Sequence, residues 1–223
     1  MTRPPTLRPF ASTDLTSERR DYSGPRLLEA ESPPEPLELF SSWIERARSD
    51  GLLDATAMVV STATPDGRPS ARVVLLKGQD DRGFVFFTRY STQKGAELAA
   101  NPRASLLFHW RELDRQVRID ASIERLPLHE SEEYFASRPR LSQLAAHAAS
   151  RLEQVAAGAL EARFAAAAER WQDRPIEMPE DWGGYRARPG RIEFWQGRPN
   201  RLHDRLVYEL DATGRWSRHR LAP

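Results

Sequence analysis

Apolar positions recur along most of the chain with two different spacings, which predict short strands interrupted by helices. Leu37, Phe40 and Ile44 repeat at helical spacing and predict a helix over 36–50. Residues 116–124 alternate cleanly between apolar and polar, as a half-buried strand does. The other predicted strands cover 57–63, 70–77, 84–88, 104–110, 191–196, 206–210 and 216–221. Further helices are expected near 91–100, 129–137, 139–148 and 151–171.

The connections between the predicted strands indicate the fold class. Short apolar runs joined by turn signals such as Pro65-Asp66-Gly67 favour an antiparallel sheet over a parallel one. The element order fits a mainly β (α+β) protein, a closed or nearly closed antiparallel barrel of about six strands decorated by helices. Residues 1–35 are rich in proline and poor in large apolar residues, so we expect a flexible N-terminal arm before a single domain over 36–223.

Composition narrows the functional classes. The 223 residues include 33 basic and 32 acidic side chains, and a net charge of +1 gives no bulk attraction to nucleic acid or to an anionic membrane. The chain has no cysteine, which excludes disulfides, thiolate metal sites and cysteine nucleophiles. We expect no metal site. Neither a secretory signal nor an apolar run long enough for a membrane span is visible, so the expected location is the cytoplasm.

Lys77 and Lys94 are the only lysines, beside 31 arginines. Either these two positions require a compact ammonium group, or codon bias has left two lysines by chance. Lys94 follows Ser91 and Thr92 at the start of a predicted helix, where free N–H groups favour an anion, although such residues often act only as caps. Arg72 and Lys77 bracket an apolar run, and five-residue spacing on a strand turns one of them inward unless Lys77 ends the strand in solvent.

Two further clusters carry candidate chemistry. Tyr134, Arg138 and Ser142 are spaced by four residues, and their phenol, guanidinium and hydroxyl groups suit phosphate oxygens. If residues 201–205 are extended, three cationic or titratable side chains share one face there, and their mutual repulsion favours an electron-rich partner nearby. Trp195 could form a flat wall beside them. The alternative for both clusters is a set of solvated surface charges.

In this order and at this spacing, the motifs resemble one family. They are Arg72 to Lys77, the helix start Ser91-Thr92-Gln93-Lys94-Gly95, Gln116, Ser137 to Gln143, Trp182-Gly183-Gly184-Tyr185-Arg186, Ile192 to Gly197, Arg201 to Arg205 and the C-terminal Arg220-Leu221-Ala222-Pro223. Over roughly residues 18–223 the chain resembles pyridoxamine 5′-phosphate oxidase. The resemblance implies a homodimeric Greek-key split barrel with FMN at the subunit interface. It also implies oxidation of pyridoxamine or pyridoxine 5′-phosphate by O2 to pyridoxal 5′-phosphate, with release of H2O2.

The resemblance also implies a role for individual residues. The residues expected at FMN are Arg72, Val73, Leu75, Lys77, Phe87, Thr88, Gln93, Lys94, Gln116, Trp195 and Arg205. The residues expected at the substrate are Lys77, Tyr134, Arg138, Ser142, Arg201 and His203, with Arg19, Tyr22 and Asp54 helping to enclose it. Arg201 and His203 are the expected catalytic residues, placed over the substrate ring. Both lysines fall at phosphate-facing positions of the family pattern.

The chain departs from the family pattern at two places. Gln93 stands where many members have a second cation, and residues 147–153 lack a Gln-Ser pair that contacts FMN across the dimer. Ser150 and Arg151 are candidate replacements, and a lower FMN affinity is one expected consequence. Two alternatives stay open, a split-barrel flavin oxidase acting on another ring, as in phenazine-forming relatives, and a non-catalytic FMN- or pyridoxal-phosphate-binding protein. A nucleic-acid-binding module ranks last.

Overall fold

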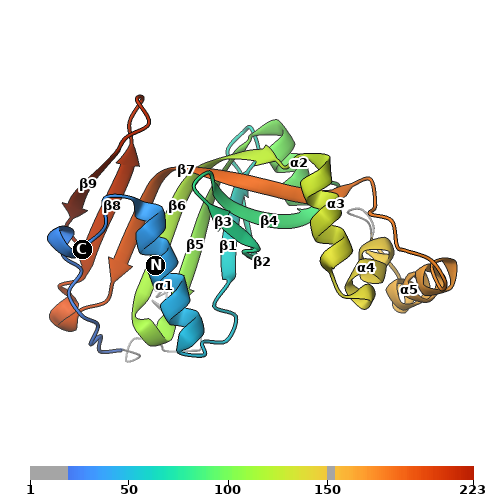
Figure 1. The fold of residues 1–223 in the computed structure, drawn as a ribbon, viewed down its shortest axis with the longest axis horizontal. Helices are drawn as coiled ribbons and strands as arrows, with labels where there is room; N and C mark the ends of the chain where they lie inside the picture. The colour runs from blue at the N-terminus through green and yellow to red at the C-terminus, as the bar shows by residue number, and fades with distance from the viewer. Residues whose placement is uncertain (1–19, 150–153) are drawn as a thin grey trace, which may run out of the picture.

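A computed structural model describes residues 20–149 and 154–223 (Figure 1). Their strands form one antiparallel sheet, in which seven follow the order β2-β1-β5-β6-β7-β4-β3 and the hairpin β8–β9 continues from β7. The strands are β1 Ala57–Ala63, β2 Pro69–Leu75, β3 Gly78–Asp80, β4 Gly83–Arg89, β5 Arg103–Trp110, β6 Arg115–Arg125, β7 Trp182–Gln196, β8 Asp204–Leu210 and β9 Trp216–Leu221.

The sheet curls until its two ends approach each other. The amide of Lys77, just after β2, donates to the carbonyl of Val85 in β4 over 2.8 Å. Six strands, β2, β1, β5, β6, β7 and β4, therefore make a split barrel, with the short β3 at its edge. The predicted fold class is confirmed. The sheet has more strands than the six of the barrel, because β8 and β9 pair onward from the second half of β7 and do not help to close the barrel.

Five α-helices and three 3-10 turns decorate the described part of the sheet. The helices are α1 Pro36–Ser49, α2 Gln93–Ala100, α3 Leu128–Ser137, α4 Arg140–Ala148 and α5 Ala159–Arg170, and the turns are η1 Glu29–Glu31, η2 Arg111–Leu113 and η3 Pro199–Arg201. Helices α4 and α5 stand away from the barrel, at the end opposite to β8 and β9 (Figure 1). In the described residues no helix combines the length and the apolar character that crossing a membrane requires.

Two boundaries differ from the sequence prediction by more than two residues, and the short β3 was not predicted. Strand β7 begins at Trp182 instead of 191, because Gly183 and Gly184 pair with β4 as strand residues. A side chain at Gly183 would lie 2.2 Å from the Tyr90 hydroxyl, so close packing explains a glycine inside this strand. Helix α5 begins at Ala159, after Gly158 at φ 82°, and residues 154–158 are not helical. The predicted helix start at 151 lies outside the described residues.

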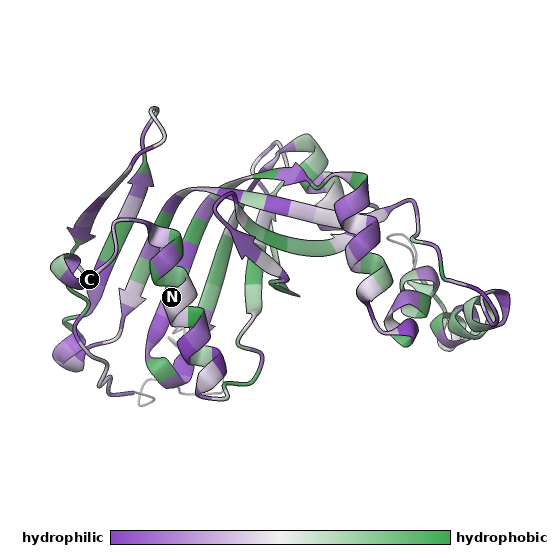
Figure 2. Cartoon of the chain, in the orientation of Figure 1, coloured by the Kyte–Doolittle hydropathy of each residue, from purple (hydrophilic) through white to green (hydrophobic). Residues whose placement is uncertain are grey.

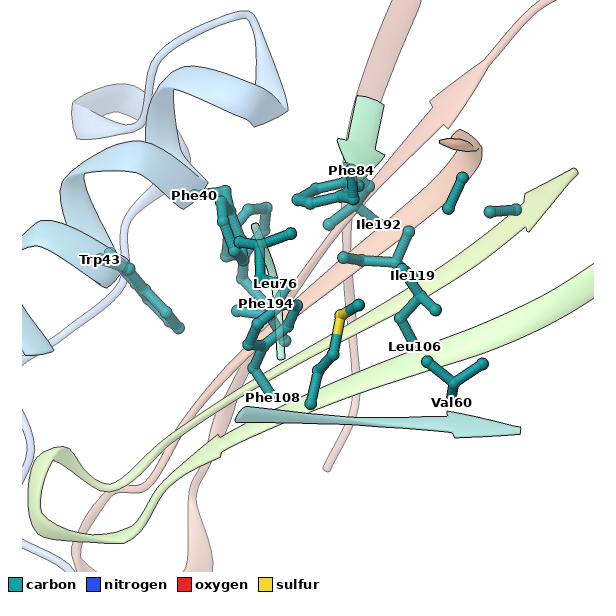
Figure 3. Packing of buried hydrophobic residues seen from close by; sticks show 14 of the residues in the cluster. Phe40, Trp43, Val60, Leu76, Phe84, Leu106, Phe108, Ile119, Ile192 and Phe194 are labelled. Atoms are coloured by element: carbon teal, nitrogen blue, oxygen red, sulfur yellow. The ribbon is translucent and has the colours of Figure 1, made fainter. Parts of the chain in front are cut away.

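The main core lies between α1 and the barrel strands. Figure 3 shows Phe40 and Trp43 of α1 pointing toward aromatic residues of the sheet. The ring of Phe40 lies 4.8 Å from that of Phe84 and 4.9 Å from that of Phe108, in edge-to-face geometry. Strand β9, by contrast, is exposed along most of its length and is coloured hydrophilic in Figure 2.

A second, smaller core holds the helical lobe, which we define as α3, α4 and α5. Its buried members include Phe135, Leu144, Trp171 and Trp182. Because Trp182 opens β7, this core fixes the lobe to the end of the strand that also pairs with β4.

Residues 20–35 lie along the opposite end of the molecule. The amide of Leu27 donates to Asp204 over 2.9 Å, and the Tyr208 hydroxyl donates to the Pro33 carbonyl over 2.8 Å. Arg218 donates to the carbonyls of Ser32 and Pro33. These contacts hold the segment against β8 and β9.

Candidate functional site

The first group of candidate residues, the β2–α2 group, consists of Arg72, Thr88 and Lys94. Lys94 is in the first turn of α2, and its Nζ donates to Thr88 Oγ1 over 2.8 Å. Arg72 points inward from β2, where its guanidinium donates to Thr62 Oγ1 and Ser70 Oγ, each over 2.6 Å. Burial, and then the charge of Arg72, lower the pKa of Lys94. The side chains of Arg72 and Lys94 are therefore two partly buried cations that lie close enough to affect each other.

The charges of these two cations are balanced differently. Arg72 lies 3.6 Å from the buried carboxylate of Glu97. No carboxylate of the described residues lies within salt-bridge distance of Lys94, so its charge is available to an external anion. Gln93 donates its side-chain amide to Glu97 over 2.8 Å, in place of presenting a cation.

Apolar side chains extend this group along β2. Val73 and Leu75 expose 65 % and 41 % of their surface, on the face of β2 opposite to that of Arg72. Exposed apolar residues on a strand suit a flat ligand or another protein surface. Lys77 follows the end of β2 and is exposed, so of the two bracketing cations it is Arg72 that faces inward.

The second group, the α3–α4 group, consists of Tyr134, Arg138 and Ser142. Tyr134 stacks on Phe87 of β4 with ring centres 3.9 Å apart, and Phe87 in turn stacks on Trp182 at 5.5 Å. The Arg138 guanidinium lies 4.9 Å from the ring centre of Trp182. The three residues do not share one continuous helix, because Arg138 has extended backbone angles between α3 and α4.

Arg138 is a cation without an anionic partner in the described structure. One of its Nη atoms is buried and makes no hydrogen bond. Burial lowers its pKa, but a guanidinium remains charged at neutral pH. A buried donor left unpaired is costly, so this arrangement favours a ligand that supplies an acceptor.

The third group, the β8 group, consists of Trp195, His203 and Arg205. The rings of Trp195 and His203 lie 4.8 Å apart, and Tyr22 packs edge-on against both at 5.5 and 5.0 Å. The Arg198 amide donates to His203 Nδ1 over 3.1 Å. Because Nδ1 then accepts, the neutral imidazole carries its proton on Nε2.

Arg205 and Gln116 flank this ring cluster. Arg205 Nε donates to Glu193 over 2.7 Å, and Gln116 of β6 is directly opposite Trp195 in the sheet register. The predicted extended stretch 201–205 holds only from Asp204, where β8 begins. Asn200 and Arg201 adopt the left-handed conformation at φ 57° and 60°, and Arg201 is exposed.

Other predicted residues are not brought together by the described chain. Asp54 is exposed in the loop before β1, at φ 52°. Arg19, Ser150 and Arg151 lie outside the described residues.

Four acidic residues bind candidates or their neighbours, and the sequence analysis gave none of them a role, although Glu193 belongs to one of its motifs. Glu97 contacts Arg72, and Glu193 binds Arg205. Asp114 pairs with Arg20 at 2.7 Å and accepts from the Ser23 amide, which fixes the segment that carries Tyr22. Asp181 accepts from Arg89 and Ser91. No spacing motif marks them, because each partner is distant in sequence or belongs to a different element.

The Arg201→Ala variant is expected to raise the pKa of His203. Burial and then the positive charge of Arg201 both lower that pKa in the native protein, so removing the charge relieves one of the two causes. An NMR titration of the imidazole measures the change. Arg215→Ala, at the exposed tip of the β8–β9 hairpin, is the matched control and should leave the pKa unchanged. An unchanged value in Arg201→Ala would show that this charge does not reach His203.

The three groups do not meet within one chain. The β8 group lies at the end of the molecule where the termini of the described chain are, whereas the α3–α4 group belongs to the helical lobe at the other end (Figure 1). The β2–α2 group belongs to the barrel between them. A site that contains all three requires residues from a second chain.

Residues 44–174 match the model of the pyridoxamine 5′-phosphate oxidase family. The chain belongs to this family. Residues 182–223 match the pyridoxine 5′-phosphate oxidase C-terminal dimerisation region, which contains β7, β8 and β9. The predicted family is thereby confirmed, and it is a family of flavin-binding oxidases.

Curated relatives match nearly the whole length of the chain. A pyridoxine/pyridoxamine 5′-phosphate oxidase of Rubrobacter xylanophilus is 52 % identical over 214 residues, covering 96 % of this chain and 98 % of its own. A second pyridoxine/pyridoxamine 5′-phosphate oxidase, from a Janthinobacterium species, is 49 % identical over 206 residues. The match covers 92 % of this chain and 97 % of the relative.

Solved structures give the same fold. PhzG of Burkholderia lata, in complex with tetrahydrophenazine-1-carboxylic acid, superposes with a TM-score of 0.84 at 32 % identity, covering 90 % of this chain and 100 % of that one. A pyridoxamine 5′-phosphate oxidase-related, FMN-binding protein of Nostoc punctiforme has a TM-score of 0.68 at 17 % identity, with 83 % and 96 % coverage, and supports the split-barrel fold alone.

Proposed function

We propose that the protein oxidises pyridoxine 5′-phosphate and pyridoxamine 5′-phosphate to pyridoxal 5′-phosphate, with FMN as cofactor and O2 as the final acceptor. Two electrons and two protons leave the alcohol or amine at the substrate's exocyclic carbon and end in H2O2. The amine substrate additionally takes up water and releases ammonia. The relatives that match nearly the whole chain carry the name of this activity.

The observation that carries the proposal is a pair of separate, partly buried cations without carboxylate partners in the described structure. Lys94 lies beside Thr88, and Arg138 lies beside the Phe87–Tyr134–Trp182 stack. Two phosphorylated aromatic molecules, a flavin nucleotide and a B6 phosphate ester, would supply an anion to each.

The residues present fit FMN. Arg72, Thr88 and Lys94 would bind its phosphate, with Val73, Leu75, Lys77, Phe87 and Gln93 nearby, and the phosphate would balance the charge of Lys94, which has no carboxylate partner among the described residues. Gln116, Trp195 and Arg205 would border its ring system. FMN supplies the hydride acceptor when bound. A guanidinium such as Arg205 near the ring would stabilise negative charge there.

The substrate would be held by its phosphate and covered on one face. Lys77, Tyr134, Arg138 and Ser142 would bind the phosphate, and Arg201 and His203 would lie over the pyridine ring. With His203 held neutral, its Nε2 proton is available for a hydrogen bond to the substrate. Tyr22 already packs against His203 and Trp195, so it would exclude water there, with Arg19 and Asp54 completing the enclosure.

The proposed active unit is a homodimer with FMN at the subunit interface. The β8 and α3–α4 groups lie at opposite ends of one chain, and residues 182–223 match a dimerisation region (Figure 1). A second copy related by two-fold symmetry would bring the β8 group of one chain to the α3–α4 group of the other, twice.

An absorption spectrum tests the proposal directly. The purified protein, or the protein mixed with FMN, is expected to show the yellow oxidised flavin spectrum. Anaerobic pyridoxine 5′-phosphate should bleach it, and admitted O2 should restore it with one H2O2 formed per pyridoxal 5′-phosphate. Binding of FMN without bleaching would favour the non-catalytic binding protein.

A second candidate is a flavin oxidase acting on a phenazine-type ring, which the fold similarity to PhzG favours. The ligand in the PhzG structure, tetrahydrophenazine-1-carboxylic acid, is a carboxylic acid without a phosphate ester. Parallel assays with pyridoxine 5′-phosphate and a reduced phenazine carboxylate separate the two, because only one of them should bleach the flavin efficiently.

A further inference from the structure

Glu97 lies in α2 and faces the strands β1 and β2. Its side chain is buried, with 5 % of the residue exposed. It accepts hydrogen bonds from Ser70 Oγ at 2.6 Å, from Gln93 Nε2 at 2.8 Å and from Thr62 Oγ1. The hydrogen bonds from Ser70 and Thr62 are the main cause that lowers its pKa to about 2. Glu97 is therefore a carboxylate at any pH near neutrality.

The same two hydroxyls contact Arg72. Thr62 Oγ1 and Ser70 Oγ each accept a hydrogen bond from the Arg72 guanidinium over 2.6 Å, and Val60 contributes a carbonyl at 3.1 Å. A hydroxyl has one proton to donate. While that proton points to Glu97, the oxygen lone pairs of Thr62 and Ser70 are directed to Arg72. The carboxylate thus orients the hydroxyls, and the hydroxyls orient the guanidinium.

Fixing Arg72 in this way matters because a planar guanidinium recognises an anion only in a defined orientation. The direct ion pair is long, 3.6 Å, so Glu97 acts on Arg72 mainly through the hydroxyls. Lys94, which donates to Thr88 Oγ1, adds a positive charge that no carboxylate of the described residues balances.

We propose that Glu97 is a positioning residue that holds Arg72 for the phosphate of FMN, and that the preference of this site for FMN over riboflavin depends on it. The proposal rests on the proposed flavin-binding function. The alternative is that Glu97 only neutralises the charge of Arg72. In that case its removal would strengthen phosphate binding, because the site would gain net positive charge.

The test compares dissociation constants for FMN and for riboflavin, which lacks the phosphate, in the wild-type protein and in Glu97→Gln. The variant is expected to bind FMN about tenfold more weakly while its affinity for riboflavin changes less than about twofold. A structural role would weaken both ligands equally. Ser70→Ala, which keeps the carboxylate but removes one bridging hydroxyl, should move the FMN-to-riboflavin ratio in the same direction. Glu45→Gln, at an exposed position of α1, controls for the loss of one negative charge.

Each outcome decides the matter. An unchanged or stronger affinity of Glu97→Gln for FMN, or equal losses for FMN and riboflavin, overturns the positioning role. If Glu97→Gln does not fold, the ratio in Ser70→Ala decides in its place. A wild-type protein that binds neither flavin overturns the proposed function itself, and the inference with it.

Discussion

A heterodimer of two impaired chains, one carrying Arg138→Ala and the other Arg201→Ala, is expected to show about half of the wild-type oxidase activity. In the proposed homodimer each site takes Arg138 from one chain and Arg201 from the other. One site of this heterodimer therefore carries both substitutions, and the other site carries neither. Two differently tagged chains, co-expressed and purified through both tags, give the heterodimer for a steady-state assay of H2O2 release at low substrate concentration.

The control uses the same substitutions in a different arrangement. A chain carrying both Arg138→Ala and Arg201→Ala, paired with a wild-type chain, has one defect in each shared site and should be as impaired as the single-variant homodimers. Sites built within single chains would give the reverse result, with the doubly substituted pairing half active and the first heterodimer impaired. The comparison thus decides whether the two ends of the chain in Figure 1 meet across an interface.

Arg138→Ala alone is expected to raise the KM for pyridoxine 5′-phosphate by about 10- to 100-fold, since a charge-assisted hydrogen bond contributes about 1.5–3 kcal/mol. Arg138 has a buried Nη atom with no described partner, so its main loss should be in ligand binding. The dissociation constant for FMN should stay within about twofold of the wild-type value, because Lys94 and Arg72 belong to a different group. Steady-state kinetics and a flavin titration measure the two quantities.

Arg170→Ala is the matched control for this variant. Arg170 also places its guanidinium over a tryptophan of the helical lobe, 5.2 Å from the ring centre of Trp171, but it is exposed and has no buried unpaired nitrogen. Its KM should not change. Equal effects of the two substitutions would mean that Arg138 acts through the packing of the lobe, and a phosphate-binding role would then fail.

Strands that adjoin a clear turn signal were predictable from the sequence almost to the residue. β1 and β9 match their predicted bounds of 57–63 and 216–221, because Pro65-Asp66-Gly67 follows the first and Gly214 precedes the second, and the cleanly alternating stretch 116–124 lies within β6. The first half of β7 was missed because two adjacent glycines usually mark a turn, whereas here they make room for Tyr90 and for Leu126 and Phe87. Such a requirement depends on a neighbour distant in sequence, which no local pattern contains.

In the candidate site, too, local patterns predicted some features, whereas contacts between residues distant in sequence were missed. Lys94 and Tyr134 occupy helices that spacing alone predicted. The partners that orient the candidates were not predictable, because Glu97 looks like one more helix glutamate until β1 and β2 surround it. The resemblance to a family named Arg201 and His203 as a pair, while periodicity suggested an extended strand that starts only at Asp204.

The two consecutive left-handed residues before β8 set a limit on protein engineering. Asn200 tolerates φ 57° reasonably well, but an arginine at φ 60° costs roughly 1–2 kcal/mol. Glycine would relieve that cost, so a screen that rewards only heat resistance should tend to discard the Arg201 guanidinium. With Arg201 in its proposed place over the substrate, variants selected for a higher melting temperature in this loop would be more stable but slower oxidases, and turnover has to be scored in the same round of selection.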